Sequence, residues 1–171
     1  MHMMISFFGY KIESLTGGLH LGFALICLAL GPLIFLRRKG TRSHRLLGRS
    51  WALMMLIMNI SALMTYDING KPNMFHAFAI LNLCALIPAF IFIRRYIKTR
   101  NPRYLQSHKE MMVWAYFGLL AAGVWQGLTG LIRFEIIDIS PALFFGTLGA
   151  LTCLTSFGLG HYLSRQRLKI K

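Results

Sequence analysis

The chain has 171 residues, of which 56% are hydrophobic and only 14% are charged. Soluble domains carry roughly 25% charged residues, whereas this chain contains several uncharged runs of about 20 residues, each long enough to cross a bilayer core of roughly 30 Å. The composition excludes an ordinary soluble domain. It predicts an integral membrane protein in which residues 1–171 form one domain.

The net charge of +14 would indicate nucleic-acid binding in a soluble protein. Here most of the 19 cations lie in the segments 37–49, 94–109 and 165–171, which alternate with segments that contain few cations. Because membrane proteins concentrate Lys and Arg on the cytoplasmic side, this pattern predicts an N-terminus outside, a C-terminus inside and no nucleic-acid partner. The expected partners are the lipid bilayer and its anionic headgroups.

The first two membrane spans are expected at residues 16–36 and 44–66. Residues 1–15 are partly amphipathic and are expected to lie along the outer membrane surface. His20 lies about one turn inside the first span. The second span follows a basic loop, and Ser43 is expected to cap its start because a serine side chain can accept from the first free N–H groups of a helix.

The third and fourth spans are expected at residues 74–93 and 111–133, with His76 at the outer start of the third. A second basic loop separates them. Ser107 and Glu110 have the S-x-x-E spacing of a capping box just before an apolar run, so the fourth span is expected to begin there.

The fifth span is expected at residues 141–163. The first four spans are expected to form a four-helix core, with the fifth as a peripheral helix packed beside it. The predicted fold is therefore an all-α membrane protein with five transmembrane helices.

The histidines form a weak internal repeat. The first and third spans run in the same direction and carry His20 and His76 near their outer ends. The second and fourth run the other way and begin with Ser-His-Arg at 43–45 and Ser-His-Lys at 107–109. This repeat predicts an outer layer that contains His20 and His76, and an inner layer that contains His44 and His108.

Two imidazoles at one depth on facing helices can hold a planar metal cofactor between them. The two layers therefore predict two bis-histidine haem b sites and an electron path across the bilayer. Arg133, at the outer end of the fourth span, is expected to pair with a haem propionate or with Glu135 or Asp138. The alternative for His20 and His76 is an interhelical hydrogen bond, and for the inner histidines a bond to lipid phosphate or to loop carbonyls.

Other chemistry is sparse in this chain. It contains no CxxC, HExxH or phosphate-loop motif, and the expected spans contain no Asp or Glu, which argues against a proton-coupled transporter. Four mid-span polar residues are expected to form interhelical hydrogen bonds and are too scattered to define a substrate path: Asn59, Ser61, Asn82 and Gln126.

The sequence resembles a family of bacterial multi-pass membrane proteins defined by a domain of unknown function. The matching features are a first-span histidine with a Gly-Pro exit, His-Arg-x-x-Gly-Arg, a later span histidine and His-x-x-x-Met. Here they are His20 with Gly31-Pro32, residues 44–49, His76, and His108 with Met112. The resemblance implies a multi-pass protein of the bacterial cytoplasmic (inner) membrane.

A looser similarity exists to small di-haem b-type cytochromes, from which this chain departs by placing its inner histidines at the helix edge. The resulting functional hypothesis is a redox protein that passes electrons across the bilayer, to or from a quinone or another redox protein. One alternative is a non-enzymatic accessory, assembly or scaffold protein with interfacial histidines. A weaker one is a zinc or copper site at the cytosolic edge, formed by His44, His108 and His161. Whether the protein is an enzyme stays open.

Overall fold

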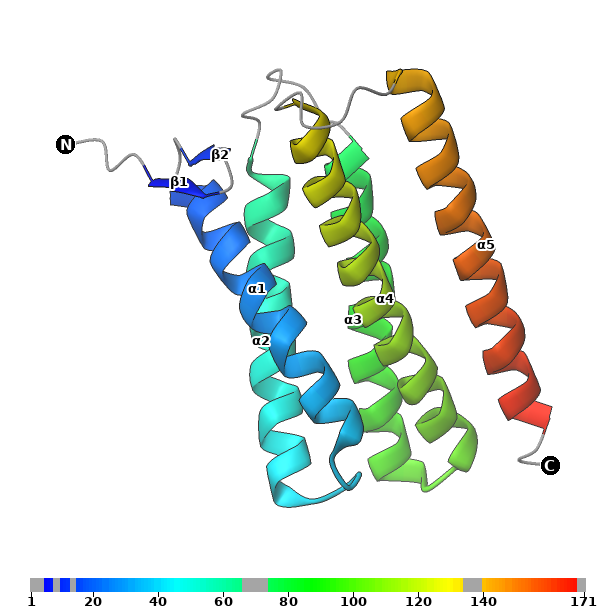
Figure 1. The fold of residues 1–171 in the computed structure, drawn as a ribbon. Coiled ribbons are helices and arrows are strands. Elements are labelled where there is room, and N and C mark those ends of the chain that lie inside the picture. Colours follow the sequence, from blue (N-terminus) through cyan, green and yellow to red (C-terminus); the bar gives the residue numbers. More distant parts are fainter. Residues whose placement is uncertain (1–4, 8–9, 13–14, 66–73, 134–139, 169–171) are drawn as a thin grey trace.

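The computed structural model describes residues 5–7, 10–12, 15–65, 74–133 and 140–168. Five helices make up most of this part (Figure 1). They are α1 (Leu15–Leu36), α2 (Arg42–Leu63), α3 (Met74–Thr99), α4 (Pro102–Arg133) and α5 (Pro141–Leu168). The predicted number of five helices is confirmed.

Two short strands precede the first helix. They are β1 (Ile5–Phe7) and β2 (Tyr10–Ile12), which pair antiparallel with Ile5 opposite Ile12. Isoleucine and aromatic residues favour strands, and their alternation in this segment accounts for the pairing. The sequence analysis expected only a partly amphipathic surface segment here, so a small hairpin must be added to the predicted all-α fold.

Helix α2 begins earlier than expected. Its N-cap is Thr41, whose Oγ1 accepts a hydrogen bond from the backbone N–H of His44 at 3.2 Å. The prediction that Ser43 caps this helix was wrong, because Ser43 lies inside the first turn, where its hydroxyl accepts from Nη1 of Arg37 at 2.6 Å. Threonine and serine cap helices by the same chemistry, so sequence alone could not choose between them.

Helix α4 begins nine residues before its predicted start, at Pro102. The side chain of Asn101 accepts from the N–H of Arg103 at 3.0 Å, and proline is favoured at the first helical position, where its missing N–H is not needed. Ser107 and Glu110 therefore lie inside the helix and form no capping box. Helices α3 and α4 extend beyond the apolar core into the basic segment, which sequence analysis had interpreted as a loop.

The first four helices form a closed ring. Helices α1 and α2 pack as one antiparallel pair and α3 and α4 as another, while α2 also contacts α3 and α1 contacts α4. Consequently α1 lies diagonally across from α3, and α2 from α4. Helix α5 packs mainly against α4 in the described part (Figure 1), where Nε1 of Trp125 donates to Oγ1 of Thr152 at 3.0 Å.

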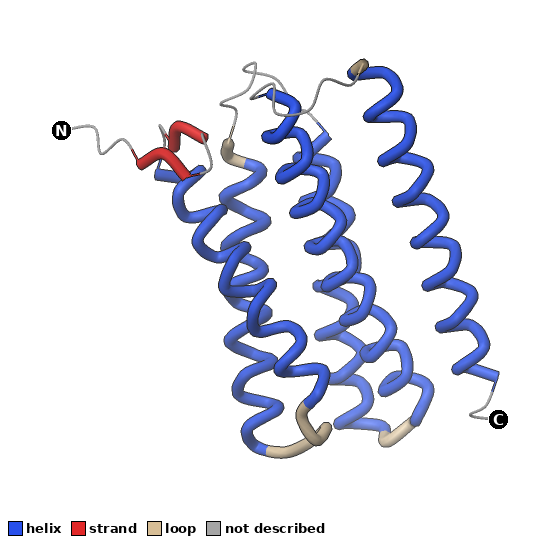
Figure 2. The backbone as a smooth tube through the Cα atoms, viewed as in Figure 1, coloured by secondary structure: helices blue, strands red, loops and turns tan. Residues whose placement is uncertain are grey.

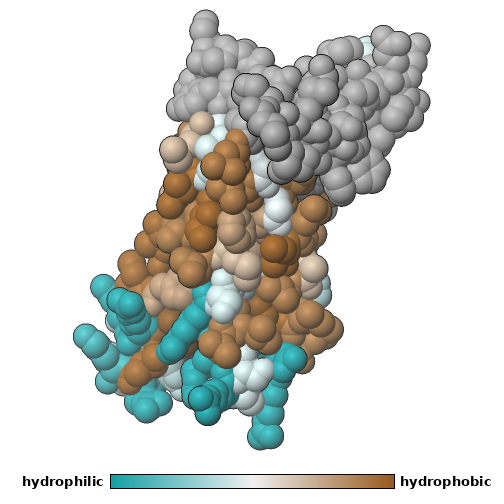
Figure 3. All heavy atoms as spheres, turned by 90° about the vertical axis from the view of Figure 1, so that its left-hand side faces the viewer, coloured by the Kyte–Doolittle hydropathy of each residue, from teal (hydrophilic) through white to brown (hydrophobic). Residues whose placement is uncertain are grey.

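Figure 2 shows that the short loops joining α1 to α2 and α3 to α4 lie at the same end of the bundle. We call this the basic end, because it carries the cations of segments 37–49 and 94–109. We call the other end, near His20 and His76, the opposite end. Figure 3 shows an apolar belt above a hydrophilic cap at the basic end.

Four helices are long and apolar enough to cross a membrane: Leu15–Leu36, Arg42–Leu63, Phe75–Thr99 and Pro102–Leu128. Large apolar side chains on all four are exposed to the surroundings, among them Leu25, Leu53, Leu81 and Leu120. A continuous exposed apolar belt is the surface that lipid covers. Helix α5 is present as predicted.

The half of the bundle toward the basic end is tightly packed. Trp51 is buried and its Nε1 donates to the carbonyl of Cys27 at 2.9 Å, which joins α2 to α1. The ring of Tyr116 lies directly on Gly31, and its hydroxyl donates to the carbonyl of Leu28 at 3.1 Å, which joins α4 to α1. Bulky aromatic rings therefore fill the space between these helices.

Candidate functional site

His20 is held by the neighbouring helix. It lies on α1, and its Nδ1 is 3.1 Å from the carbonyl oxygen of Met58 on α2. Because a carbonyl oxygen only accepts, Nδ1 carries the proton in this contact and Nε2 is the nitrogen left for another partner. The predicted interhelical hydrogen bond is thus present, and it also leaves a nitrogen that can act as a ligand.

His108 has the same arrangement at the basic end. Its Nδ1 is 2.9 Å from the carbonyl oxygen of Ala89 on α3. His44 lies beside the carbonyl of Ile34 on α1, and its buried Nδ1 has no hydrogen-bond partner among the described residues. Each of the two predicted inner-layer histidines therefore lies against a main-chain carbonyl of a neighbouring helix.

His76 is buried near the start of α3. It lies on the helix diagonal to that of His20, as the predicted outer layer requires, but it does not line the same cavity. Arg133 is the last residue of α4, and its side chain lies outside what the structure describes, as do Glu135 and Asp138. The predicted pairing of Arg133 remains a prediction.

The interhelical contacts repeat between the two helix pairs. His44 lies beside the carbonyl of Ile34, which follows His20 by 14 residues. His108 bonds the carbonyl of Ala89, which follows His76 by 13 residues. Further along, Sγ of Cys27 contacts the carbonyl of Trp51 at 3.8 Å, and Nδ2 of Asn82 donates to that of Ala115 at 2.7 Å. Because these carbonyls lie seven residues after His44 and His108, respectively, the predicted internal repeat extends to hydrogen bonding.

A metal site with three protein ligands is not formed in the described part of the chain. No three His, Cys, Asp or Glu side chains there come close enough to hold one ion. His161 is an exposed residue of α5, the helix that packs beside the four-helix core. The weaker hypothesis, a zinc or copper site built from His44, His108 and His161, therefore receives no structural support.

A small cavity lies at the centre of the bundle toward the opposite end. It has a volume of about 50 Å³ and is lined by all four core helices. Each helix contributes one polar side chain, and small residues such as Ala24, Ala62 and Ala122 surround them. The polar lining residues are His20, Asn59, Asn82 and Gln126.

Two of these polar residues form a buried network. Nδ2 of Asn59 donates to the carbonyl of Met55 at 2.7 Å and to Oδ1 of Asn82 at 3.1 Å, which joins α2 to α3. Nδ2 of Asn82 in turn reaches the carbonyl of Ala115 on α4. Sequence analysis correctly predicted interhelical hydrogen bonds for these residues. Their convergence on one cavity was not predicted, because it depends on the rotation of each helix.

One acidic residue is buried inside α4. Glu110 is only 2% exposed, and its Oε1 accepts from Nε2 of Gln106 at 2.9 Å. Sequence analysis assigned this carboxylate to a helix cap at the membrane edge. The longer α4 instead places it within the helix, where its burial requires polar partners.

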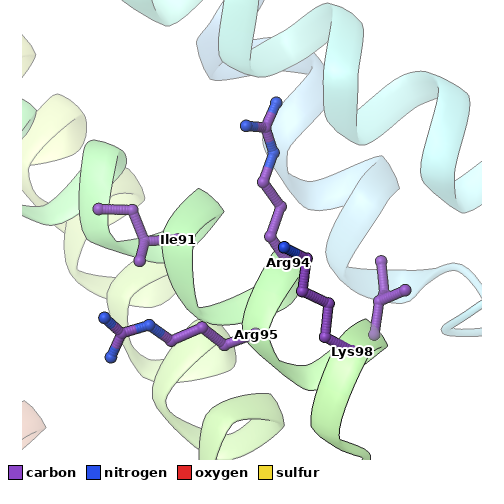
Figure 4. A pocket seen from close by; sticks show the side chains of 5 residues that line it. Ile91, Arg94, Arg95 and Lys98 are labelled. Atoms are coloured by element: carbon purple, nitrogen blue, oxygen red, sulfur yellow. The ribbon is translucent and has the colours of Figure 1, made fainter.

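The basic end of α3 carries a shallow, open hollow on the protein surface. Figure 4 shows Ile91, Arg94, Arg95 and Lys98 around it, with the cationic side chains extending away from the helix. Ile97 completes the lining. Cations placed next to exposed isoleucines offer both a charge for a phosphate and an apolar surface for an acyl chain.

Comparison with known proteins identifies the family. The family described as "Predicted membrane protein (DUF2306)" matches residues 17–158, which include the four core helices and most of α5. The chain belongs to this family. Its membership confirms the resemblance to a membrane protein family of unknown function, while the similarity to di-haem cytochromes remains a prediction. No curated protein and no solved structure matches the chain.

Proposed function

We propose that this protein is a membrane-bound electron carrier that holds b-type haem through paired histidines of its four-helix core. The observation that supports this most is the orientation of two imidazoles, because Nδ1 of His20 and Nδ1 of His108 each bond a main-chain carbonyl of the adjacent helix. A histidine that ligates a metal through one ring nitrogen usually donates from the other to such a carbonyl, which fixes the ring and makes the ligating nitrogen more basic.

The helix order supports the pairing. His20 and His76 lie on one diagonal of the ring, and His44 and His108 lie on the other. Bound haem would supply an iron that accepts and releases one electron, and the protein would tune it through burial and hydrogen bonds to the ligands. The proposed redox partner is a quinone or a second redox protein, and Arg133 is the proposed partner of a propionate.

The ligands fit haem in their chemistry, but the volume between the helices does not. The cavity beside His20 measures about 50 Å³, whereas pockets for drug-sized ligands measure roughly 300–1,000 Å³. At the basic end the rings of Trp51 and Tyr116 fill the bundle. Binding of haem therefore requires the two helix pairs to separate, which would break contacts such as the Asn59–Asn82 bond.

Optical spectroscopy tests this proposal. Protein expressed with ample haem precursor and purified in detergent should show a Soret band and a sharp reduced α-band. The double variants His20→Ala/His76→Ala and His44→Ala/His108→Ala should each lose part of the α-band, whereas His161→Ala, which changes an exposed histidine on α5, should lose none. A folded wild-type protein that stays colourless after incubation with haemin would rule the proposal out.

A second candidate function is a non-enzymatic membrane scaffold or assembly factor. It is favoured by the same hydrogen bonds, because an imidazole bonded to a carbonyl of its helix neighbour also serves simply to join two helices. The scaffold predicts a colourless protein without metal by elemental analysis. It also predicts that replacing His20 with Gln, which can still donate to the Met58 carbonyl, preserves the stability of the fold.

We also propose that the basic end binds anionic lipid headgroups. The support is the hollow of Ile91, Arg94, Arg95, Ile97 and Lys98, in which three cations lie beside apolar side chains. One of the three, Arg95, lies over the ring of Tyr104 at 5.8 Å, which orients its guanidinium. Arg94 and Lys98 are exposed and are the residues proposed to contact a phosphate.

A further inference from the structure

Several polar groups that line the cavity at the opposite end can form more hydrogen bonds than those described above. The hydrogen bonds of Asn59 and Asn82 occupy both N–H groups of Asn59 and one of Asn82. Three groups in the lining can still form a hydrogen bond: Oδ1 of Asn59, the second N–H of Asn82 and Nε2 of His20. Gln126 adds its side-chain amide, which both donates and accepts, to the same lining. Asn59 is only 1% exposed, so its remaining oxygen faces the interior of the bundle.

We propose that this cavity is a binding site for a cluster of water molecules inside the membrane-spanning bundle. A buried polar group without a partner is costly, and cavities that contain water are those that offer it two to four polar partners. The volume of about 50 Å³ accommodates a small cluster, on the order of three molecules.

The charge balance of the site selects the ligand class. The lining contains amides, an imidazole and apolar side chains, and no carboxylate. A cation would therefore lack a counter-charge in a region of low dielectric constant, and an anion would meet no Arg or Lys. A small neutral molecule that both donates and accepts hydrogen bonds matches the lining, and water is the smallest of these.

Hydroxyl-radical footprinting of the wild-type protein in detergent tests this inference, because radicals formed from bound water label the side chains beside it. Met58 and Met55 both lie on α2 and are both buried, with 4% of Met58 and 0% of Met55 exposed. They differ in that Met58 lines the cavity and Met55 does not. Met58 should be labelled severalfold faster than Met55. Equal, slow labelling of the two would overturn the proposal, since both would then be dry.

A pair of glycine variants gives a second readout. A Cβ at Gly123, which lines the cavity, would meet only Leu28 at 3.8 Å, and a Cβ at Gly127 of the same helix would meet nothing within 4 Å. Gly123→Ala should lower Met58 labelling because its methyl group displaces water, and Gly127→Ala should not change it. Unchanged labelling in Gly123→Ala would contradict the proposal. The labelling is measured on haem-free protein, because haem bound at His20 would break the Asn59–Asn82 bond and change the cavity. The result is therefore decided independently of haem binding.

Discussion

The two halves of the four-helix core follow the same histidine repeat and are packed differently. Toward the basic end, the rings of Trp51, Tyr116 and Phe35 pack between the helices, and the edge-to-face pair of Phe35 and Tyr116 has centroids 5.4 Å apart. Toward the opposite end, amides and small side chains surround a cavity of about 50 Å³. The comparison teaches that aromatic packing closes one half, while a polar network with small neighbours leaves room in the other.

The largest effect on the free energy of unfolding is expected from adding a side chain to the tightly packed half of the core, toward the basic end. A Cβ at Gly31 would lie 2.2 Å from the ring of Tyr116, so Gly31→Ala forces the helices apart. Overpacking of this kind costs about 1–3 kcal/mol in the free energy of unfolding. Thermal unfolding in detergent should show the loss, and Tyr116→Ala in the same chain should relieve it.

The control for this prediction is Gly22→Ala on the same helix, because a Cβ at Gly22 meets nothing within 4 Å. The gain in helix propensity is the same for both glycines, so the difference between the two variants measures the clash alone. If Gly31→Ala were as stable as Gly22→Ala, the basic half would not be closed as described.

The next effect concerns the polar network of the opposite half. Asn82→Leu removes the bond to Asn59 and leaves the carbonyl of Ala115 without its side-chain donor. Leaving buried polar groups unsatisfied costs about 1–3 kcal/mol. Chemical denaturation should detect this loss. Thr155→Ala, which removes an exposed hydroxyl bonded within its own helix, should cost much less.

A smaller effect is expected from the histidine–carbonyl bonds. His108→Phe keeps a ring of similar shape and removes the bond to the carbonyl of Ala89. The net value of such a bond is about 0.5–1.5 kcal/mol. The same substitution at exposed His161 should leave the unfolding curve unchanged. Equal stabilities for the two variants would show that the bond of His108 does not support the fold.

The smallest effect on stability is expected outside the core, at the hollow of α3. Arg94→Gln/Lys98→Gln should leave stability within about 0.5 kcal/mol, because both side chains are exposed. Retention of phosphatidylglycerol by the purified protein should nevertheless fall, since each cation contributes roughly 1 kcal/mol to binding an anionic surface. Arg38→Gln/Arg42→Gln, which removes two exposed cations from the other loop, is the control. An equal loss in both variants would indicate general attraction and no specific site.

The positions of the helices within the chain could be predicted from sequence because length and apolarity determine which segments can cross a bilayer. Each of the five predicted spans overlaps one observed helix. The start of α4 was missed, because its first turns, Pro102 to Lys109, are mostly polar or basic and carry little apolar signal. The buried state of Glu110 was missed for the same reason.

What the sequence by itself determined is the set of apolar helices, the basic end and the repeat of histidines, since these depend only on residue type and spacing along the chain. The tertiary structure alone decided which faces meet. The rotation of each helix brought Asn59 and Asn82 to one cavity and placed Tyr116 on Gly31. A sequence records the order of side chains on each helix, but the angle at which helices pack depends on contacts between residues far apart in the chain.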